Sequence, residues 1–274
     1  MIKLSPKIFS HLILISGILL MIIPIWMIFA SSTHSNSTIR SEGMQIFIGD
    51  NFINNYDKVL NIKSGFSKEI NATGMLINSF IMAFGIATLT VITSLMSAFA
   101  IVYFKFRLAV PFFWLIFITI LVPLELRIMP SYQVVSDLGL INTYTGLILP
   151  LSASAIATFF FRQFYLSIPN ELLEAAKLDG ADSWKFFIDF LIPLSKTMIT
   201  AMFIFMFVYG YNQYLWPIIM TTSEKYWTVV MGMKMIYGGY SVERYAYIIL
   251  SMLPPVLVII ILQRFFIQGL FQSK

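Results

Sequence analysis

The sequence predicts an all-α membrane protein with six transmembrane helices, and two observations lead to this fold class. Of the 274 residues, 58% are hydrophobic and only 11% are charged, whereas an ordinary soluble domain carries about 25% charged residues. Six stretches without a charge are long enough to cross a bilayer, which takes about 20 apolar residues. Backbone groups in lipid must form their hydrogen bonds internally, so we expect each stretch to be a helix.

The predicted spans form one transmembrane domain that covers the whole chain, residues 1–274. The first span is a largely apolar run of 22 residues, longer than the apolar region of a signal peptide, which has about 7–15 residues. No A-x-A cleavage site follows it, so we expect a retained anchor. The polar segment 31–73 is expected to form a compact external loop, and a second polar loop covers 167–195. The predicted spans are about 9–30, 75–103, 109–130, 143–163, 198–220 and 245–264.

An even number of spans places both termini on the same side of the membrane. If that side is cytoplasmic, ten Lys and Arg residues lie inside and eight outside, in the direction of the positive-inside rule. The stretch 105–107, with two basic residues and no acid, is the cleanest local signal. We therefore predict cytoplasmic termini and a cytoplasmic loop between the fourth and fifth spans.

The first half of that loop has the signals of a short helix. Asn170 can cap a helix that runs to about Leu178. Glu171 and Glu174 lie in its first turn, where negative charge suits the helix dipole. Gly180 follows as a C-terminal stop. The pattern predicts a helix with an acidic start and a sharp end.

The second half of the loop predicts another short helix, capped by Asp182 or Ser183 and ended by Pro193. Small residues on the first helix would let another protein come close, and the acids Glu174 and Asp179 can meet basic groups at the rim. A docking element and a connector lying on the bilayer both fit this pattern. Acids outnumber bases five to three over 171–196, which argues against adhesion to anionic lipid.

The same loop resembles the coupling motif of binding-protein-dependent ABC importer permeases. That motif is Glu-Ala-Ala, three residues, Gly, nine residues, then Ile-x-Leu-Pro. In register with it stand Glu174, Ala175, Ala176, Gly180 and Pro193. The chain departs from it at Phe190 and Ile192, which are apolar like the residues they replace. The resemblance implies that this loop, with Asp179 among its contacts, inserts into a cleft of an ATPase subunit.

Other stretches extend the resemblance over nearly all of 78–269. Those similar to the sugar-type branch of these permeases are 78–84, 97–101, 161–164 and 210–217. Those similar to the second permease of glycerol-3-phosphate importers are 113–119, 123–130 and 193–197. The resemblance implies a type I ABC importer permease fold with a cytoplasmic coupling helix-turn-helix. It further implies that sn-glycerol-3-phosphate or glycerophosphodiesters are carried, with a neutral sugar or oligosaccharide as the alternative solute.

The resemblance also implies a location and a set of partners. The location is the bacterial inner membrane, in several passes. The partners are a second homologous permease, two ATPase subunits that hold ATP and magnesium, and an external solute-binding protein. Gly238, Gly239 and Tyr240 form the tip of an external loop that, by resemblance, reaches toward the binding protein, although a short connector without contacts is the alternative.

Charged and polar residues within the predicted spans are candidates for the translocation path. Glu125 and Arg127 lie near the outer end of the third span, and charges at membrane depth usually face a cavity or a partner. Arg127 would attract an anionic phosphate, while snorkelling to the interface or a salt bridge to the partner permease would also account for it. Asn212 and Gln213 in the fifth span, and Asn78 in the second, can bind a polyol or instead join helices through hydrogen bonds.

The residues that several kinds of nucleotide, metal or catalytic site require are missing from this sequence. No G-x-x-x-x-G-K-[ST] loop is present to hold a nucleotide. The chain has no Cys, and its two histidines, His11 and His34, are distant in sequence, so a zinc or Cys–His centre is not expected. We therefore predict a non-catalytic subunit without a cofactor of its own. The net charge of +5 is scattered, which fits membrane topology rather than a nucleic-acid surface.

Two other classes of membrane protein, secondary transporters and intramembrane enzymes, have sequence features that differ from those of an importer permease. A secondary transporter driven by an ion gradient would show charged relay residues deep in several spans, and often inverted repeats. An intramembrane enzyme would need a buried Ser–His pair, paired Asp residues or a metal site. The sequence shows neither pattern.

Overall fold

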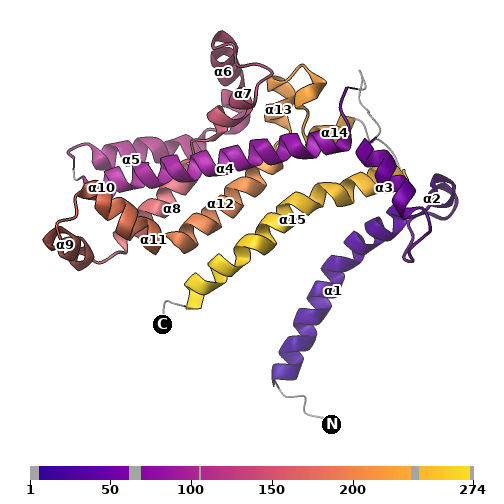
Figure 1. The fold of residues 1–274 in the computed structure, drawn as a ribbon, viewed down its shortest axis with the longest axis horizontal. Coiled ribbons are helices and arrows are strands. Elements are labelled where there is room, and N and C mark those ends of the chain that lie inside the picture. The colour runs from indigo at the N-terminus through magenta and orange to yellow at the C-terminus, as the bar shows by residue number, and fades with distance from the viewer. Residues whose placement is uncertain (1–5, 62–68, 105, 236–240, 272–274) are drawn as a thin grey trace. The chain divides into compact units, whose positions relative to one another are not determined.

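The computed structural model describes residues 6–61, 69–104, 106–235 and 241–271, and Figure 1 shows them as helices joined by loops. No β-strand occurs among these described residues, as the predicted all-α class requires. The long helices are α1 (Pro6–Ser32), α4 (Ala72–Tyr103), α12 (Lys196–Tyr211) and α15 (Val242–Phe271). The intermediate helices are α3 (Phe52–Asn61), α5 (Ala109–Ile118), α6 (Leu124–Asp137), α8 (Ala155–Leu166) and α9 (Asn170–Leu178).

The remaining elements are short and lie mostly next to the long ones. The short α-helices are α2 (Asn36–Glu42), α7 (Tyr144–Ile148), α10 (Ser183–Lys185), α11 (Ile192–Leu194), α13 (Leu215–Met220) and α14 (Val229–Met235). Three 3₁₀ turns are η1 (Thr119–Leu121), η2 (Leu149–Leu151) and η4 (Glu224–Tyr226). The segment η3 (Phe186–Leu191) is π-helical.

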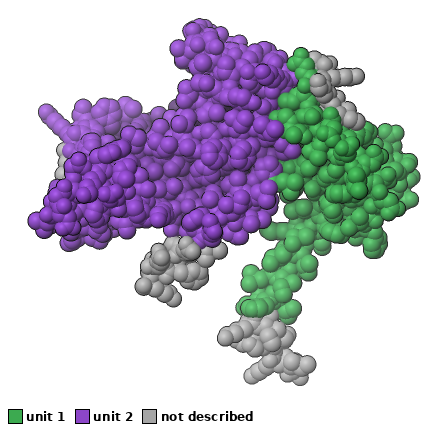
Figure 2. Space-filling view, viewed as in Figure 1, with its two compact units in different colours: residues 1–75, 231–253 green, residues 76–230, 254–274 purple. Residues whose placement is uncertain are grey.

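The contacts within the chain divide it into two compact units, coloured separately in Figure 2. Unit 1 consists of Met1–Met75 and Met231–Leu253, and unit 2 of Leu76–Val230 and Pro254–Lys274. Helices α4 and α15 contribute residues to both units. The predicted coupling loop and the predicted path residues all belong to unit 2.

Three helices are long and apolar enough to cross a membrane alone, namely Phe9–Ser32, Ala72–Tyr103 and Val242–Phe265. They correspond to the predicted first, second and sixth spans. Three further pairs of helices pass the same test together, each bent at a short break. Among the described residues, the number of spans therefore reaches six when each bent pair is counted as one.

The predicted third span, 109–130, is wrong as a single straight helix. Helical structure stops at Leu121, and the next helix leaves at 108° to the first. Pro123 accounts for the break because proline has no N–H to donate. Val122, which precedes it, takes an extended backbone with ψ of 108°, as the steric clash with the proline ring favours. Arg127 consequently lies near the start of α6.

The predicted fourth span, 143–163, is also interrupted. It consists of Tyr144–Leu151 and Ala155–Leu166, bent by 48° relative to each other. Ser154 begins the second piece, because its hydroxyl accepts the N–H of Ala157 at 3.2 Å and so satisfies a free donor of the first turn. The interruption leaves 152–154 as non-helical backbone inside the span.

The predicted fifth span, 198–220, ends earlier than expected. Helix α12 stops at Tyr211, and the short α13 follows only after a turn. The bent pair that passes the membrane test here is Ser183–Leu194 with Lys196–Tyr211, at 74°. The predicted span 198–220 therefore covers most of α12, the turn 212–214 and α13, and it is not one straight helix.

A buried hydrophobic cluster of unit 2 joins α4, α8 and α12 to the loop between α8 and α12. Aromatic rings dominate its interior: the Phe99 ring lies 4.8 Å from that of Phe187, and the Tyr103 ring 5.3 Å from that of Phe186. We call it the main cluster, and its buried members are Val91, Leu95, Ala98, Phe99, Ala157, Phe161, Tyr165, Ala176, Phe186, Phe187, Leu191 and Met202.

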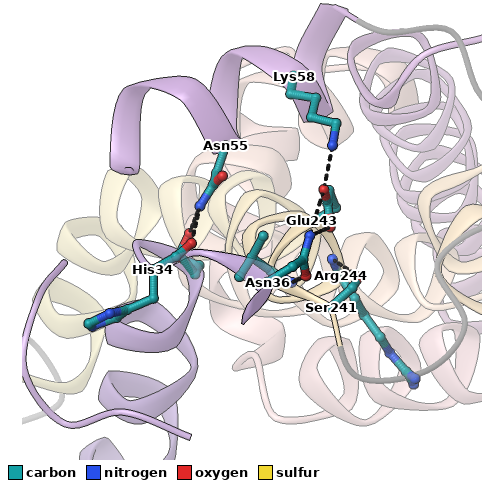
Figure 3. A network of polar contacts seen from close by, with 9 residues as sticks. His34, Asn36, Asn55, Lys58, Ser241, Glu243 and Arg244 are labelled. Atoms are coloured by element: carbon teal, nitrogen blue, oxygen red, sulfur yellow. Dashed lines mark hydrogen bonds and ion pairs between the residues drawn. The ribbon is translucent and has the colours of Figure 1, made fainter. Parts of the chain in front are cut away.

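In unit 1, a polar network ties the start of α15 to α2 and α3 (Figure 3). The amide nitrogen of Asn36 donates to both carboxylate oxygens of Glu243, at 3.1 and 3.0 Å. Its amide oxygen accepts the backbone N–H of Val242 at 3.0 Å. Lys58 completes the network with an ion pair of 2.6 Å to Glu243. Three sequence-distant segments are thus held at one carboxylate.

A second set of hydrogen bonds fixes α3 against the end of α1. The Asn55 amide donates to the carbonyls of Ser32 and His34, both at 2.8 Å. Tyr56 and Ser32 share a hydrogen bond of 2.9 Å between their hydroxyls. Burial raises the pKa of Tyr56 above its ordinary value, with the hydrogen bond to Ser32 acting in the opposite direction. The segment that follows the first span is therefore a folded structure with its own contacts.

Candidate functional site

Helix α9 carries the predicted coupling residues and begins at Asn170. Pro169 occupies the N-cap position, and no side chain caps the helix. The predicted cap by Asn170 is therefore wrong, because that residue has already entered the helix. A proline before the first turn suits the start of a helix, where its missing N–H costs no hydrogen bond.

The end of α9 is a tight, glycine-dependent turn, as the sequence predicted. Gly180 has φ of +76°, a backbone region that residues with a Cβ rarely adopt. Its N–H donates to the carbonyl of Lys177 at 3.0 Å, and the N–H of Ala181 donates to that of Ala176 at 2.9 Å. These two bonds define a Schellman motif. They reverse the chain sharply and satisfy carbonyls that the helix leaves free.

The second helical piece begins at Asp182, whose carboxylate accepts the N–H of Lys185 at 2.7 Å. Of the two predicted caps, the structure uses Asp182 rather than Ser183. Helical structure continues through Pro193 to Leu194 and bends at Ser195. The predicted end at Pro193 is therefore early by one residue. Proline is tolerated there because it lies near the start of α11.

The π-helical segment η3 fixes this second piece to the main cluster. Phe186, Phe187 and Leu191 are all buried. In an α-helix with 3.6 residues per turn, side chains five positions apart would point to different sides. The wider π-helical turn brings Phe186 and Leu191 closer to one face, so both reach the same cluster.

Burial separates the predicted coupling residues into two groups. Glu174, Ala175, Asp179 and Gly180 are exposed. The side chain of Ala176 is only 1% exposed and belongs to the main cluster. Its small size lets α9 lie close against that cluster. Ala176 therefore holds the helix in place, and the other four residues form its outer surface.

Two large apolar side chains stand out on the same loop. Leu178 is 89% exposed and Trp184 is 58% exposed. The Trp184 ring stacks on the ring of the buried Phe187, with 5.5 Å between the ring centroids, and this contact holds it in position. Trp184 was missed as a site residue, although a tryptophan in a short helix rich in charged neighbours was a usable signal. Both a contact with another protein and a contact with the bilayer surface would cover these two exposed side chains.

Asn78, predicted for the translocation path, is buried within a hydrogen-bonded joint of unit 2. Its amide donates to the carbonyls of Lys225 and Trp227, at 2.8 and 2.9 Å. Its amide oxygen accepts the hydroxyl of Tyr144 at 2.7 Å. The neighbouring Ser79 accepts the N–H of Val229 at 2.8 Å. The structure thus brings α4, α7 and the segment 225–229 together at Asn78.

Asn142 makes a second attachment for the same segment, which the sequence did not reveal. Its amide oxygen accepts the N–H groups of Thr222 and Ser223 at 2.8 and 3.0 Å. Its φ of +57° is a conformation that asparagine adopts more readily than most residues. An asparagine before a Thr-Tyr pair was the only local signal, and it is too common to single out a site.

Asn212 and Gln213 lie in the turn between α12 and α13, outside any continuous span. The Asn212 amide donates to the carbonyl of Val208 at 2.9 Å, and that of Gln213 to Tyr209 at 3.2 Å. Both side chains therefore satisfy carbonyls at the end of α12. The structure does not bring them together with Asn78 through any hydrogen bond among the described residues.

Arg127 lines a cavity of about 190 Å³ between η1, α6, α8 and α12. Asn78, Asn212 and Gln213 are not among the residues that line it. Gly238, Gly239 and Tyr240, predicted to dock a binding protein, lie outside the described residues. The four predicted path residues therefore lie in three places. Arg127 lines a cavity, Asn78 hydrogen-bonds three segments together, and Asn212 and Gln213 lie at the end of α12.

Comparisons with known proteins show which family the chain resembles. A family profile described as "Binding-protein-dependent transport system inner membrane component" matches residues 91–272. The "sn-glycerol-3-phosphate transport system permease protein UgpE" of Brucella melitensis biotype 1 is 42% identical over 283 residues, covering 100% of both chains. The protein of the same name from Yersinia pestis bv. Antiqua is 42% identical over 97% of this chain and 96% of its own.

A solved structure supports the fold. A chain of a bacterial ABC transporter involved in the import of the acidic polysaccharide alginate superimposes with a TM-score of 0.74, covering 97% of this chain and 100% of its own. The sequence identity is 21%, so this likeness concerns the fold alone.

Proposed function

The chain belongs to the family of binding-protein-dependent transport system inner membrane components, and from that membership we propose that it carries sn-glycerol-3-phosphate or its diesters across the bacterial inner membrane. The observation that supports this choice of solute is the 42% identity, over the full length of both chains, to permeases named for this compound. The proposal includes cytoplasmic termini, as the distribution of basic residues predicts. A neutral sugar remains the alternative solute for the same mechanism.

In this proposal the chain is one of two permeases, and ATP is hydrolysed by two separate ATPase subunits. The loop 167–195 couples them to the membrane helices. Its outer surface presents Glu174, Ala175 and Asp179 together with the exposed Leu178 and Trp184. Small and apolar groups with acids at the rim suit a cleft in another protein better than an anionic membrane surface.

The packing of the loop supports its role as a lever. Ala176, Phe186, Phe187 and Leu191 connect the loop to the main cluster, which also contains side chains of α4, α8 and α12. Closely packed interiors transmit displacement rather than absorbing it. A movement imposed on the outer surface of α9 by a closing ATPase pair would therefore move the membrane helices as a body.

The test is ATP-dependent uptake in proteoliposomes that contain the permease pair, the ATPase subunits and the binding protein. We expect uptake of labelled sn-glycerol-3-phosphate, little uptake of maltose, and no uptake driven by an ion gradient without ATP. Uptake of maltose alone would contradict the solute and leave the importer intact. Uptake that needs only an ion gradient would contradict the importer mechanism itself.

A further inference from the structure

Two interruptions of the predicted spans meet at one cavity in unit 2. Residues 119–120, next to the break between η1 and α6, line it, and so do 153–155 at the break before α8. Its volume of about 190 Å³ is well above the about 30 Å³ that one water occupies in the liquid. In membranes, non-helical backbone occurs where it is buried in protein or lines a watery cavity. The two breaks therefore indicate a solvated chamber within the spans.

Arg127 is the one charged side chain among the residues that line this cavity. It makes no hydrogen bond or ion pair with any residue that the structure describes. Glu125 lies two positions earlier on α6, is not among the lining residues, and at that spacing does not share a helix face with Arg127. Arg127 is exposed at the cavity, and the charges of both Arg127 and Glu125 act on the lining residue Tyr209. A charge at membrane depth usually faces a cavity or a partner, so an anion that enters this cavity would meet a guanidinium without an ion pair.

Other lining groups suit an oxyanion. Ser154 accepts the N–H of Ala157 through its hydroxyl oxygen at 3.2 Å, and its O–H remains able to donate. Tyr209 of α12 adds a second hydroxyl to the lining, whereas the Thr119 hydroxyl already donates to the carbonyl of Ile116 at 2.6 Å. The first turn of α8 also borders the cavity, and the positive end of its helix dipole acts in the same direction as Arg127. Cation and hydroxyl donors from several elements thus converge on one space.

We propose that this cavity receives the phosphate group of the transported ester, with Arg127 as its principal ligand and Ser154 and Tyr209 as additional donors. This inference rests on the proposed solute and adds the residues that recognise it. Arginine suits the role because its planar guanidinium binds two phosphate oxygens at once. Selection would then occur twice, in the binding protein and again inside the permease.

The experiment compares the wild-type complex with Arg127→Gln, Arg127→Lys and the control Arg40→Gln in proteoliposomes. Arg40 is an exposed arginine of α2 and is not among the residues that line the cavity, so its loss removes the same charge without changing the lining. Two quantities are measured, namely uptake of labelled sn-glycerol-3-phosphate and the ATPase activity stimulated by loaded binding protein. A charge-assisted hydrogen bond contributes about 1.5–3 kcal/mol, which corresponds to roughly tenfold or more in rate.

We expect Arg127→Gln to lower uptake about tenfold or more while stimulated ATPase activity stays within about twofold of wild type. Arg127→Lys should retain part of the uptake because it keeps the charge but binds as a single point. Arg40→Gln should behave as wild type.

Unchanged uptake in Arg127→Gln would overturn the phosphate site and leave the proposed solute standing. Loss of complex assembly in Arg127→Gln would overturn it as well, because Arg127 would then pair with the partner permease. A wild-type complex that carries a neutral sugar and no phosphate ester would overturn the solute and the phosphate site together.

Discussion

At Gly180 a single backbone angle decides the shape of the coupling loop. A Cβ built on this glycine meets no atom within 4 Å, so space does not require glycine there. The φ of +76° does, because residues with a Cβ pay about 1–2 kcal/mol in this region. The requirement for glycine in the motif is therefore conformational and not a matter of contact with a neighbour.

We expect Gly180→Ala to weaken the turn by about 1–2 kcal/mol and to reduce transport more than it reduces ATPase activity. Gly180→Pro should abolish transport, because proline fixes φ near −65° and removes the N–H that bonds Lys177. Uptake and ATP hydrolysis in proteoliposomes measure both effects. Lys177→Ala, an exposed change on the same helix, is the control. Full coupling in Gly180→Pro would show that the turn is not part of the lever.

Asn78 shows how one buried amide can hold three segments. Its three side-chain hydrogen bonds, to Lys225, Trp227 and Tyr144, cross between elements far apart in the sequence. Removing a buried partner leaves carbonyls unsatisfied, at about 1–3 kcal/mol for each group. Substitution to alanine would therefore cost much more than loss of an exposed amide.

We expect Asn78→Ala to lower the melting temperature of the purified complex and to make the segment 221–229 sensitive to protease. Asn78→Asp should resemble alanine, because a carboxylate cannot donate to the two carbonyls. The control is Asn212→Ala, whose exposed amide serves only the end of its own helix. Equal thermal stability of wild type and Asn78→Ala would argue against the joint.

Among the elements, the loop between α8 and α12 combines a buried inner side with an exposed outer side. Its inner side is fixed by Ala176 and by the π-helical turn, and its outer side carries Leu178 and Trp184. Large apolar anchors often carry most of the energy at protein–protein contacts. Substitution of these two exposed side chains therefore tests docking to another subunit without removing a buried contact of the fold.

We expect Leu178→Ser and Trp184→Ser each to weaken association with the ATPase subunits by about tenfold or more, as truncation of an interface anchor costs about 2 kcal/mol or more. The permease itself should remain folded, because neither side chain is buried in the chain. Co-purification and concentration-dependent ATPase activity give the measurement. Lys185→Ser is the control. If association is unchanged in both variants, the outer surface is not the docking face.

The start of α15 in unit 1 depends on another element contact, the ion pair of Lys58 with Glu243. Glu243 is partly buried, with 18% of its side chain exposed, and Asn36 also donates to it. A carboxylate that accepts three hydrogen bonds from two side chains contributes more to stability than an open surface ion pair. It ties α2 and α3 to the start of α15.

We expect Glu243→Gln to lower thermal stability more than Lys58→Met does, because Glu243 serves both Lys58 and Asn36. The double variant should be less damaging than the sum of the two singles, which a double-mutant cycle measures. Additive losses would show that the two side chains do not interact in the folded protein.

At the scale of the whole molecule, the proposed topology of six passes predicts that the segment 31–73 and the loop 167–195 are on opposite sides of the membrane. The chain contains no cysteine, so single cysteines can be introduced without removing native ones. Ser41 and Ser183 are both exposed and lie on α2 and α10.

We expect Ser41→Cys to react with a membrane-impermeant maleimide in intact cells lacking an outer-membrane barrier, and Ser183→Cys to react only after the inner membrane is opened. Ser195→Cys, at a buried position, should stay unreactive in both conditions. Reaction of Ser183→Cys in intact cells would reverse the predicted orientation.

The sequence by itself determined the all-α class and the short helix that ends before Gly180, while the count of six spans and the coupling role of 167–195 stay predictions. Long uncharged stretches dictate helices in lipid whatever surrounds them, and the Glu174 to Gly180 spacing encodes a helix and its end locally. Only the tertiary structure decided which spans are broken, because apolar composition is the same for a straight helix and a bent one. It also decided that Ala176 faces inward, that Asn78 joins segments, and that Arg127 borders a cavity. Each of these depends on contacts between residues distant in sequence, and local pattern carries no record of them.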